Sequence, residues 1–283
     1  MQNSEPAAAA GAAPKRPLHD IGARVASALV LIPIGLAAAW YGGPWMAGAC
    51  GAAAVIMSYE WTRMSEPLSL NFAFAFCLTA VFGAVLLTSW GRFDWAFGWL
   101  CAVAAVSAVR RRSAAGAMET FGGVLYVGTP CALFLALRAH EPGGREAILG
   151  LFSIIWATDA AAYFGGTLIG GPRVSRRLSP QKTWAGLIVG TLAGAAAGAA
   201  FALIVSGPPV LWTLAGALVG AVGLFGDLFE SALKRRFNVK DASGLIPGHG
   251  GFLDRLDGLM FATVLAWLAL WLAPDLMPRL LGR

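Results

Sequence analysis

Charged residues are scarce in this 283-residue chain, at 13% of the sequence, whereas 58% of the residues are hydrophobic. Soluble domains carry about 25% charged residues, so the composition excludes an ordinary soluble enzyme and a disordered chain. The net charge is +6, but so few charges do not indicate a nucleic-acid-binding domain. Basic residues in such a chain are typical of cytoplasmic loops and of contact with anionic lipid headgroups.

Cysteine is also rare, and its placement excludes two further classes of protein. All four cysteines lie in apolar runs, and none forms a C-x-x-C pair. We therefore expect buried, reduced packing residues, with neither a disulfide framework nor a zinc site. The four are Cys50, Cys77, Cys101 and Cys131.

Long apolar runs fill most of the chain and predict membrane-spanning helices, because a backbone in lipid must satisfy its own hydrogen bonds. Residues 1–24, rich in Ala and Pro, predict a disordered cytoplasmic tail rather than a cleaved signal peptide. The nine runs are Val25–Trp40, Trp45–Thr62, Asn71–Trp90, Trp95–Val109, Phe121–Leu137, Glu146–Phe164, Thr183–Val205, Val210–Leu233 and Leu256–Ala273. We predict an all-α integral membrane protein with about nine transmembrane helices and a polar cavity facing the cytoplasm. Residues 25–145 form its N-terminal helices and residues 146–283 its catalytic region.

The basic residues predict the orientation of these helices. With nine spans and a cytoplasmic N-terminus, 16 of the 21 Lys and Arg residues fall in inside segments and five fall outside. Such an excess marks the cytoplasmic side. The two long loops, Gly165–Lys182 and Lys234–Arg255, then both lie inside. Since polar loops often carry function, we expect the active site to face the cytoplasm.

Four carboxylates fall inside the apolar runs, where they are costly and indicate function. Glu60 lies near the end of the second run, and we expect it at the interface, paired with Arg63. Asp159 has no basic neighbour in sequence, and Tyr163 follows it on the same helix face. Asp227, Glu230, Ser231 and Lys234 share one face of the eighth run. A polar stripe on an apolar helix requires a water-filled cavity, a metal ion or a partner helix.

The loop after the eighth run combines acids, glycines and cations. Asp254 and Asp257 are three residues apart at a predicted helix start, and hard oxygen ligands of this kind suit Mg²⁺. The segment His249-Gly250-Gly251 offers backbone N–H groups that a phosphate can approach closely. Countercharge for a polyphosphate comes from Lys234, Arg235, Lys240 and Arg255. This combination indicates phosphoryl or nucleotidyl transfer.

The segment from Ser231 to Asp257 closely resembles the signature of the phosphatidate cytidylyltransferases, also called CDP-diacylglycerol synthases. The family pattern is S-x-x-K-R, then K-D, then P-G-H-G-G-x-x-D-R-x-D, and this sequence fills each fixed position. The preceding Gly226, Asp227 and Glu230 also fit the family.

A second block, from Asp159 to Gly186, resembles the same family with two departures. Many members carry Arg or Lys where Thr167 stands, and a second lysine where Gln181 stands. Two cations are therefore missing, which bears on nucleotide affinity rather than on the type of reaction. The pair Glu60-Trp61 also resembles the N-terminal half of the family.

The resemblance implies that CTP and phosphatidate give CDP-diacylglycerol and pyrophosphate, a step of phospholipid biosynthesis, at the inner membrane. A hard divalent cation such as Mg²⁺ is the expected cofactor, with Asp227, Asp254 and Asp257 as its ligands. The expected catalytic residues are Asp227, Asp254, Lys234 and Arg255. The expected substrate-binding residues are Asp159, Tyr163, Ser179, Lys182, Thr183, Glu230, Ser231, Arg235, Lys240, Asp241, His249, Gly250 and Gly251. The expected partners are these substrates and the bilayer, without nucleic acid, and a homodimer is left open.

Three alternatives stay open at this point. A CTP-dependent polyprenol kinase shares the lipid acceptor and the nucleotide donor. An inactive paralogue is suggested by Gln181 and Thr167. An ion-coupled transporter predicts polar residues throughout the helices and an internal repeat, and the sequence has neither.

Overall fold

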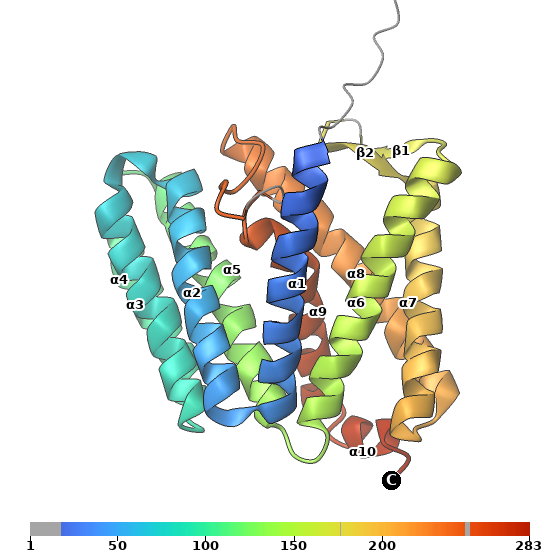
Figure 1. Ribbon diagram of the computed structural model, residues 1–283. Coiled ribbons are helices and arrows are strands. Elements are labelled where there is room, and N and C mark those ends of the chain that lie inside the picture. Colours follow the sequence, from blue (N-terminus) through green and yellow to red (C-terminus); the bar gives the residue numbers. More distant parts are fainter. Residues whose placement is uncertain (1–17, 176, 247–249) are drawn as a thin grey trace, which may run out of the picture.

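The computed structural model describes residues 18–175, 177–246 and 250–283. Within these ranges the chain is a bundle of long helices joined by mostly short turns (Figure 1). The elements are α1 (Leu18–Tyr41), α2 (Gly43–Ser65), the 3₁₀ helix η1 (Pro67–Ser69), α3 (Leu70–Ser89), α4 (Phe93–Val109), α5 (Ala114–Ala139), α6 (Gly144–Leu168), β1 (Arg173–Ser175), β2 (Ser179–Thr183), α7 (Trp184–Val205), α8 (Pro209–Arg236), α9 (Leu253–Leu272) and α10 (Leu276–Leu280).

The apolar runs predicted the helices α1 to α9 one for one. Six of them are long and apolar enough to cross a bilayer, namely α3, α5, α6, α7, α8 and α9. Two shorter apolar helices are Ala26–Tyr41, which is the later part of α1, and α4. The helix α2 has 23 residues but a less apolar sequence. The chain is thus a predominantly helical, multi-pass membrane protein.

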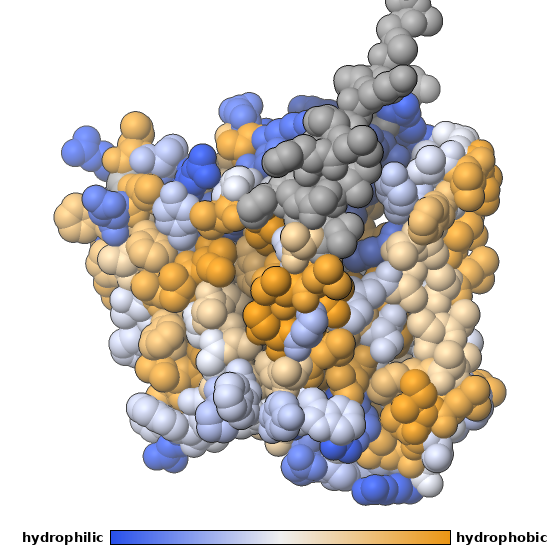
Figure 2. Space-filling model, in the orientation of Figure 1, coloured by the Kyte–Doolittle hydropathy of each residue, from blue (hydrophilic) through white to orange (hydrophobic). Residues whose placement is uncertain are grey.

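The surface of the bundle matches this assignment. Figure 2 shows a broad apolar band across the middle of the molecule, with hydrophilic residues gathered at its two ends. Large apolar side chains such as Leu192, Leu203 and Trp271 are more than 60% exposed. Exposure of this extent on a helical bundle fits contact with lipid rather than with water.

Two local features differ from the sequence predictions. The loop between α6 and α7 contains an antiparallel hairpin, in which Arg173 pairs with Thr183 and Ser175 with Ser179. The segment lacks the alternation of polar and apolar residues that signals a strand. The first helix begins at Leu18, inside the segment expected as a tail, and residues 1–17 lie outside the described ranges.

Glycine brings α7 unusually close to its neighbours. Gly190, Gly194 and Gly198 are buried one helical turn apart, and α7 packs against both α6 and α8. A Cβ atom on Gly198 would lie 2.1 Å from the carbonyl oxygen of Trp212 on α8. A seam of small residues therefore sets the helix spacing here, as is common in membranes. The cysteines are free. Three of them are buried as predicted, whereas Cys101 is only half-buried.

Candidate active site

Three carboxylates from α8 and α9 meet near one end of the bundle. Asp227 and Glu230 lie on α8, and Asp257 lies on α9. One carboxylate oxygen of each lies within 4.8 Å of the others. Glu230 is 1% exposed and Asp257 is 8% exposed, while Asp227 is half-buried. Like charges repel strongly at this distance in a poorly solvated site, so the cluster favours a bound cation or the protonation of one of its acids.

The three side chains fit a hard divalent cation. Carboxylate oxygens are the ligands that Mg²⁺ prefers. One oxygen of Glu230, Oε1, is buried without a hydrogen-bond partner in the described part of the chain. An unpaired buried acceptor of this kind is costly and is explained if it contacts a metal ion. The described residues therefore form a candidate metal site.

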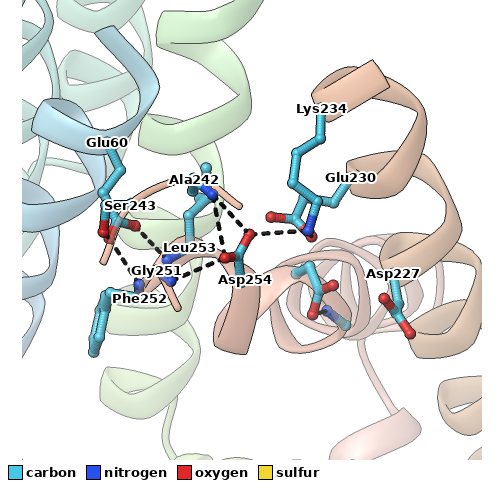
Figure 3. Close-up of polar contacts among 12 residues, drawn as sticks. Glu60, Asp227, Glu230, Lys234, Ala242, Ser243, Gly251, Phe252, Leu253 and Asp254 are labelled. Carbon is cyan, nitrogen blue, oxygen red and sulfur yellow. Dashed lines mark hydrogen bonds and ion pairs between the residues drawn. The ribbon is translucent and has the colours of Figure 1, made fainter. Parts of the chain in front are cut away.

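Lys234 lies beside the cluster and offsets part of its negative charge. Its ammonium donates to Oε2 of Glu230 at 2.9 Å and to Oδ1 of Asp254 at 3.0 Å, and Figure 3 shows it pointing between them. Asp254 also accepts hydrogen bonds from the backbone N–H groups of Ala242 and Gly251. The aspartate thus fastens the loop before α9 to the last turn of α8.

The three-carboxylate cluster differs from the predicted ligand set. Asp227 and Asp257 belong to it as expected, but its third member is Glu230, which we expected to bind substrate. Asp254 lies outside the cluster and is held by Lys234 and two amides. The spacing of Asp254 and Asp257 does not reveal this, because the third carboxylate comes from another helix. A metal contact of Asp254 stays a prediction.

The other long loop predicted from the sequence, Gly165–Lys182, reaches the cluster through one residue. Lys182, on β2, forms an ion pair with Asp227, with 2.5 Å between Nζ and Oδ2. Thr183 accepts a hydrogen bond from the N–H of Gly186 and so caps the start of α7. Asp159 on α6 lies close enough to Asp227 and Lys182 to interact with their charges. The hairpin and the acidic cluster therefore belong to one site, although they are far apart in sequence.

The remaining predicted residues differ in burial and in their contacts. Ser231 is half-buried, and Arg235, Lys240, Asp241 and Arg255 are exposed. Gly250 has a positive φ of 82°, which favours glycine. Tyr163 is exposed and packs on Phe164. Ser179 lies in β2, Gly251 is buried, and His249 lies outside the described residues.

Glu60 is the functional candidate that the sequence placed wrongly. It is fully buried, and no ion pair joins it to Arg63 or to another cation in the described ranges. Its carboxylate accepts a hydrogen bond from the hydroxyl of Ser243 and from the backbone N–H groups of Phe252 and Leu253 (Figure 3). The partners lie more than 180 residues away in sequence, whereas local spacing offered only Arg63.

An apolar cavity of about 270 Å³ lies beside the acidic cluster. It is lined by Tyr126 from α5, Val222 from α8, and Met260, Phe261 and Val264 from α9. Val222 precedes Asp227 on α8 and Met260 follows Asp257 on α9 by one turn. The site thus combines the carboxylates of α8 and α9 with an apolar cavity that the same two helices line together with α5.

Comparison with known proteins identifies the family. Residues 22–273 match the Cytidylyltransferase family, so the chain belongs to that family. It is 37% identical to the phosphatidate cytidylyltransferase of Brucella suis biovar 1 (strain 1330) over 267 residues, which cover 91% of this chain and 97% of the relative. The phosphatidate cytidylyltransferase of Rickettsia conorii (strain ATCC VR-613 / Malish 7) is 32% identical over 158 residues, covering 52% of this chain and 66% of the relative.

Proposed function

We propose that this protein transfers the cytidylyl group of CTP to phosphatidate and releases pyrophosphate, giving CDP-diacylglycerol for phospholipid biosynthesis. The observation that carries the proposal is the cluster of Asp227, Glu230 and Asp257, bordered by Lys182 and Lys234 inside a membrane bundle. Membership in the cytidylyltransferase family and the high coverage of the Brucella relative support the same reaction.

The site has the groups that such a reaction needs. A phosphatidate oxygen forms a bond to the α-phosphorus of CTP, while the bond from that phosphorus to the bridging oxygen breaks and pyrophosphate leaves. A phosphomonoester is largely dianionic near neutral pH, so its oxygen needs little help from a general base. The main barrier is repulsion between two phosphates, and cationic side chains that also orient the reactants lower it.

The three-carboxylate cluster would hold a divalent cation such as Mg²⁺, which supplies positive charge beside the reacting phosphates. Lys182 pairs with Asp227 and Lys234 pairs with Glu230, and we propose that both lysines hold phosphate oxygens. Arg235, Lys240 and Arg255 lie on the exposed loop side, where they are placed to attract a triphosphate. The exposed Asp159 carboxylate would contact the nucleotide.

The apolar cavity between α5, α8 and α9 supports a lipid acceptor. Its lining is almost entirely hydrocarbon, and it lies on the membrane side of the carboxylates. An acyl chain in this cavity would leave its phosphate near Asp227 and Lys234. The two substrates would thus reach the site from different media.

We also propose that all nine long helices cross the membrane and that the site faces the cytoplasm. Sixteen of the 21 basic residues then lie inside. Both polar loops, with the β-hairpin and the α8–α9 connection, lie at the same end of the bundle (Figure 1), as this orientation requires.

Labelled CTP tests the reaction. The purified protein in detergent, with phosphatidate and Mg²⁺, should transfer label from the α-phosphate and from cytosine to lipid, and chelation of the metal should stop the transfer. Transfer of only the γ-phosphate would identify a lipid kinase and contradict the proposal. Asp227→Asn should require more Mg²⁺ for half-maximal rate, because it removes one ligand charge.

A further inference from the structure

We propose that Glu60 is a positioning residue for this site: it holds the loop between α8 and α9 so that Asp254 and Asp257 meet the carboxylates of α8. The inference rests on the proposed function for what the site does. The contacts of Glu60 do not depend on which reaction the site carries out.

The helix α9 has no side-chain cap from its own sequence. The first turn of a helix has backbone N–H groups without partners, and a side chain just before the helix commonly accepts from one of them. The residue before α9 is Phe252, which has no capping side chain. Glu60 supplies the acceptor from another helix, at 2.8 Å from the N atom of Phe252 and 2.6 Å from that of Leu253.

Glu60 also binds the loop at two places. One carboxylate oxygen accepts from Ser243, near the middle of the connection, and from Phe252 at its end. The next residue of α2, Trp61, packs edge-on against Phe237 at the end of α8, with 5.6 Å between ring centroids. Consecutive residues of α2 therefore contact the beginning, the middle and the end of this loop.

The charge of Glu60 also suits its position at the start of α9. A fully buried carboxylate is expensive unless charge-assisted hydrogen bonds and a nearby dipole compensate it. The N-terminus of α9 carries partial positive charge, and the carboxylate of Glu60 is placed against it. A neutral side chain there would bind these amides more weakly.

These contacts lie next to the carboxylates of the site. Phe252 and Leu253 immediately precede Asp254, and Asp257 follows one turn later on the same rigid helix. Gly251 fits between Glu60 and Ala242 only because it lacks a side chain, since a Cβ there would lie 2.8 Å from Ala242 and 3.0 Å from Glu60. A shift of α9 would change the position of Asp257 relative to Asp227 and Glu230.

Glu66 provides a matched control. It is also a buried carboxylate, one residue beyond α2, and it accepts a hydrogen bond from Thr120 and pairs with Arg111 at 3.0 Å. Burial acts to raise the pKa of Glu66, but the Thr120 hydrogen bond and the charges of Arg111 and Arg110 outweigh it, so the pKa lies below its ordinary value. Its partners belong to α4–α5 and not to the site loop.

The test compares Glu60→Gln with Glu66→Gln in the full-length protein. Glutamine keeps the shape of the side chain but replaces one acceptor oxygen by a donor. We expect Glu60→Gln to lower kcat about 100-fold, the cost of small misplacements in an active site, with the KM for phosphatidate unchanged. It should also speed hydrogen exchange at the Phe252 and Leu253 amides. Glu66→Gln should lower the melting temperature but change neither kcat nor this exchange.

The two proposals fail in different ways. If the wild-type protein forms no CDP-diacylglycerol, the proposed reaction is wrong, and the exchange rates alone decide whether Glu60 holds the loop. Wild-type exchange in Glu60→Gln overturns the positioning role. A kcat that falls equally in both variants overturns it too, because the loss then follows from general destabilisation.

Discussion

At the scale of single residues, Lys234 determines whether the acidic centre can exist in the folded protein. Its side chain is 14% exposed and lies between the nearly buried carboxylates of Glu230 and Asp254. Removing one partner from a buried ion pair leaves an uncompensated charge. Here it would leave two acidic side chains facing each other, so stability and activity depend on the same ammonium group.

The substitution Lys234→Met tests this double role, because methionine keeps much of the apolar stem and removes the charge. We expect the free energy of unfolding to fall by about 3 kcal/mol and turnover to be lost. Denaturant titration in detergent and the cytidylyl-transfer assay measure the two effects.

The control for this variant is Arg236→Gln, half a turn further along α8. Arg236 pairs with Glu119 on an exposed surface, and such pairs contribute about 0.5 kcal/mol. We expect near-normal stability and turnover. Equal losses in both variants would show that the end of α8 is merely sensitive to charge removal.

At the scale of elements, the α7–α8 contact depends on the absence of side chains at the seam. The backbones approach so closely that the carbonyl oxygen of Trp212 would contact a Cβ on Gly198. A backbone atom within a helix cannot move aside, so the helices themselves would have to separate. The separation would carry Asp227 away from Lys182.

We therefore expect Gly198→Ala to destabilise the protein by about 2 kcal/mol, as overpacking does. The matched control is Gly122→Ala, also inside a helix, where a Cβ would meet nothing within 4 Å. That change should be neutral or stabilising by up to about 1 kcal/mol, the difference in helix propensity. Thermal melting in detergent compares the two. A lower melting temperature for Gly122→Ala than for Gly198→Ala would contradict the packing argument.

The helices were predictable from the sequence because a chain in lipid has few alternatives to them, and each apolar run became one helix. The hairpin β1–β2 could not be predicted from the sequence, because it is short and held mainly by backbone pairing. Asp227 and Asp257, which were predicted as ligands from the resemblance, lie together in the three-carboxylate cluster. The contacts of Glu60 could not be predicted, and neither could the membership of Glu230 in the cluster. Both depend on how helices far apart in the sequence cross, and local residue spacing gives no information about that crossing.

At the scale of the whole molecule, polar chemistry is concentrated at one end of the bundle. The hairpin and the α8–α9 connection lie there, while α10 and the C-terminus lie at the other end (Figure 1). The two ends should therefore be exposed to different aqueous compartments.

Cysteine labelling tests this arrangement in intact cells. We expect Gly244→Cys, at an exposed loop position, to react with an impermeant thiol reagent only after the membrane is opened. Asp275→Cys, exposed at the opposite end, should react without that treatment because it faces the outside. The reverse pattern would invert the topology, and labelling of both from outside would contradict a spanning bundle.

The distance in sequence between Glu60 and its partners also affects how the protein is made. Phe252 follows Glu60 by 192 residues, so at about 5–20 residues per second the ribosome needs roughly 10–40 s to supply the amides that this carboxylate binds. During that interval the carboxylate of Glu60, near the end of α2, lacks these partners, and an unpaired acid in a membrane is costly. Synthesis of α9 ends this exposure, so the last long helix to emerge completes the environment of one of the first.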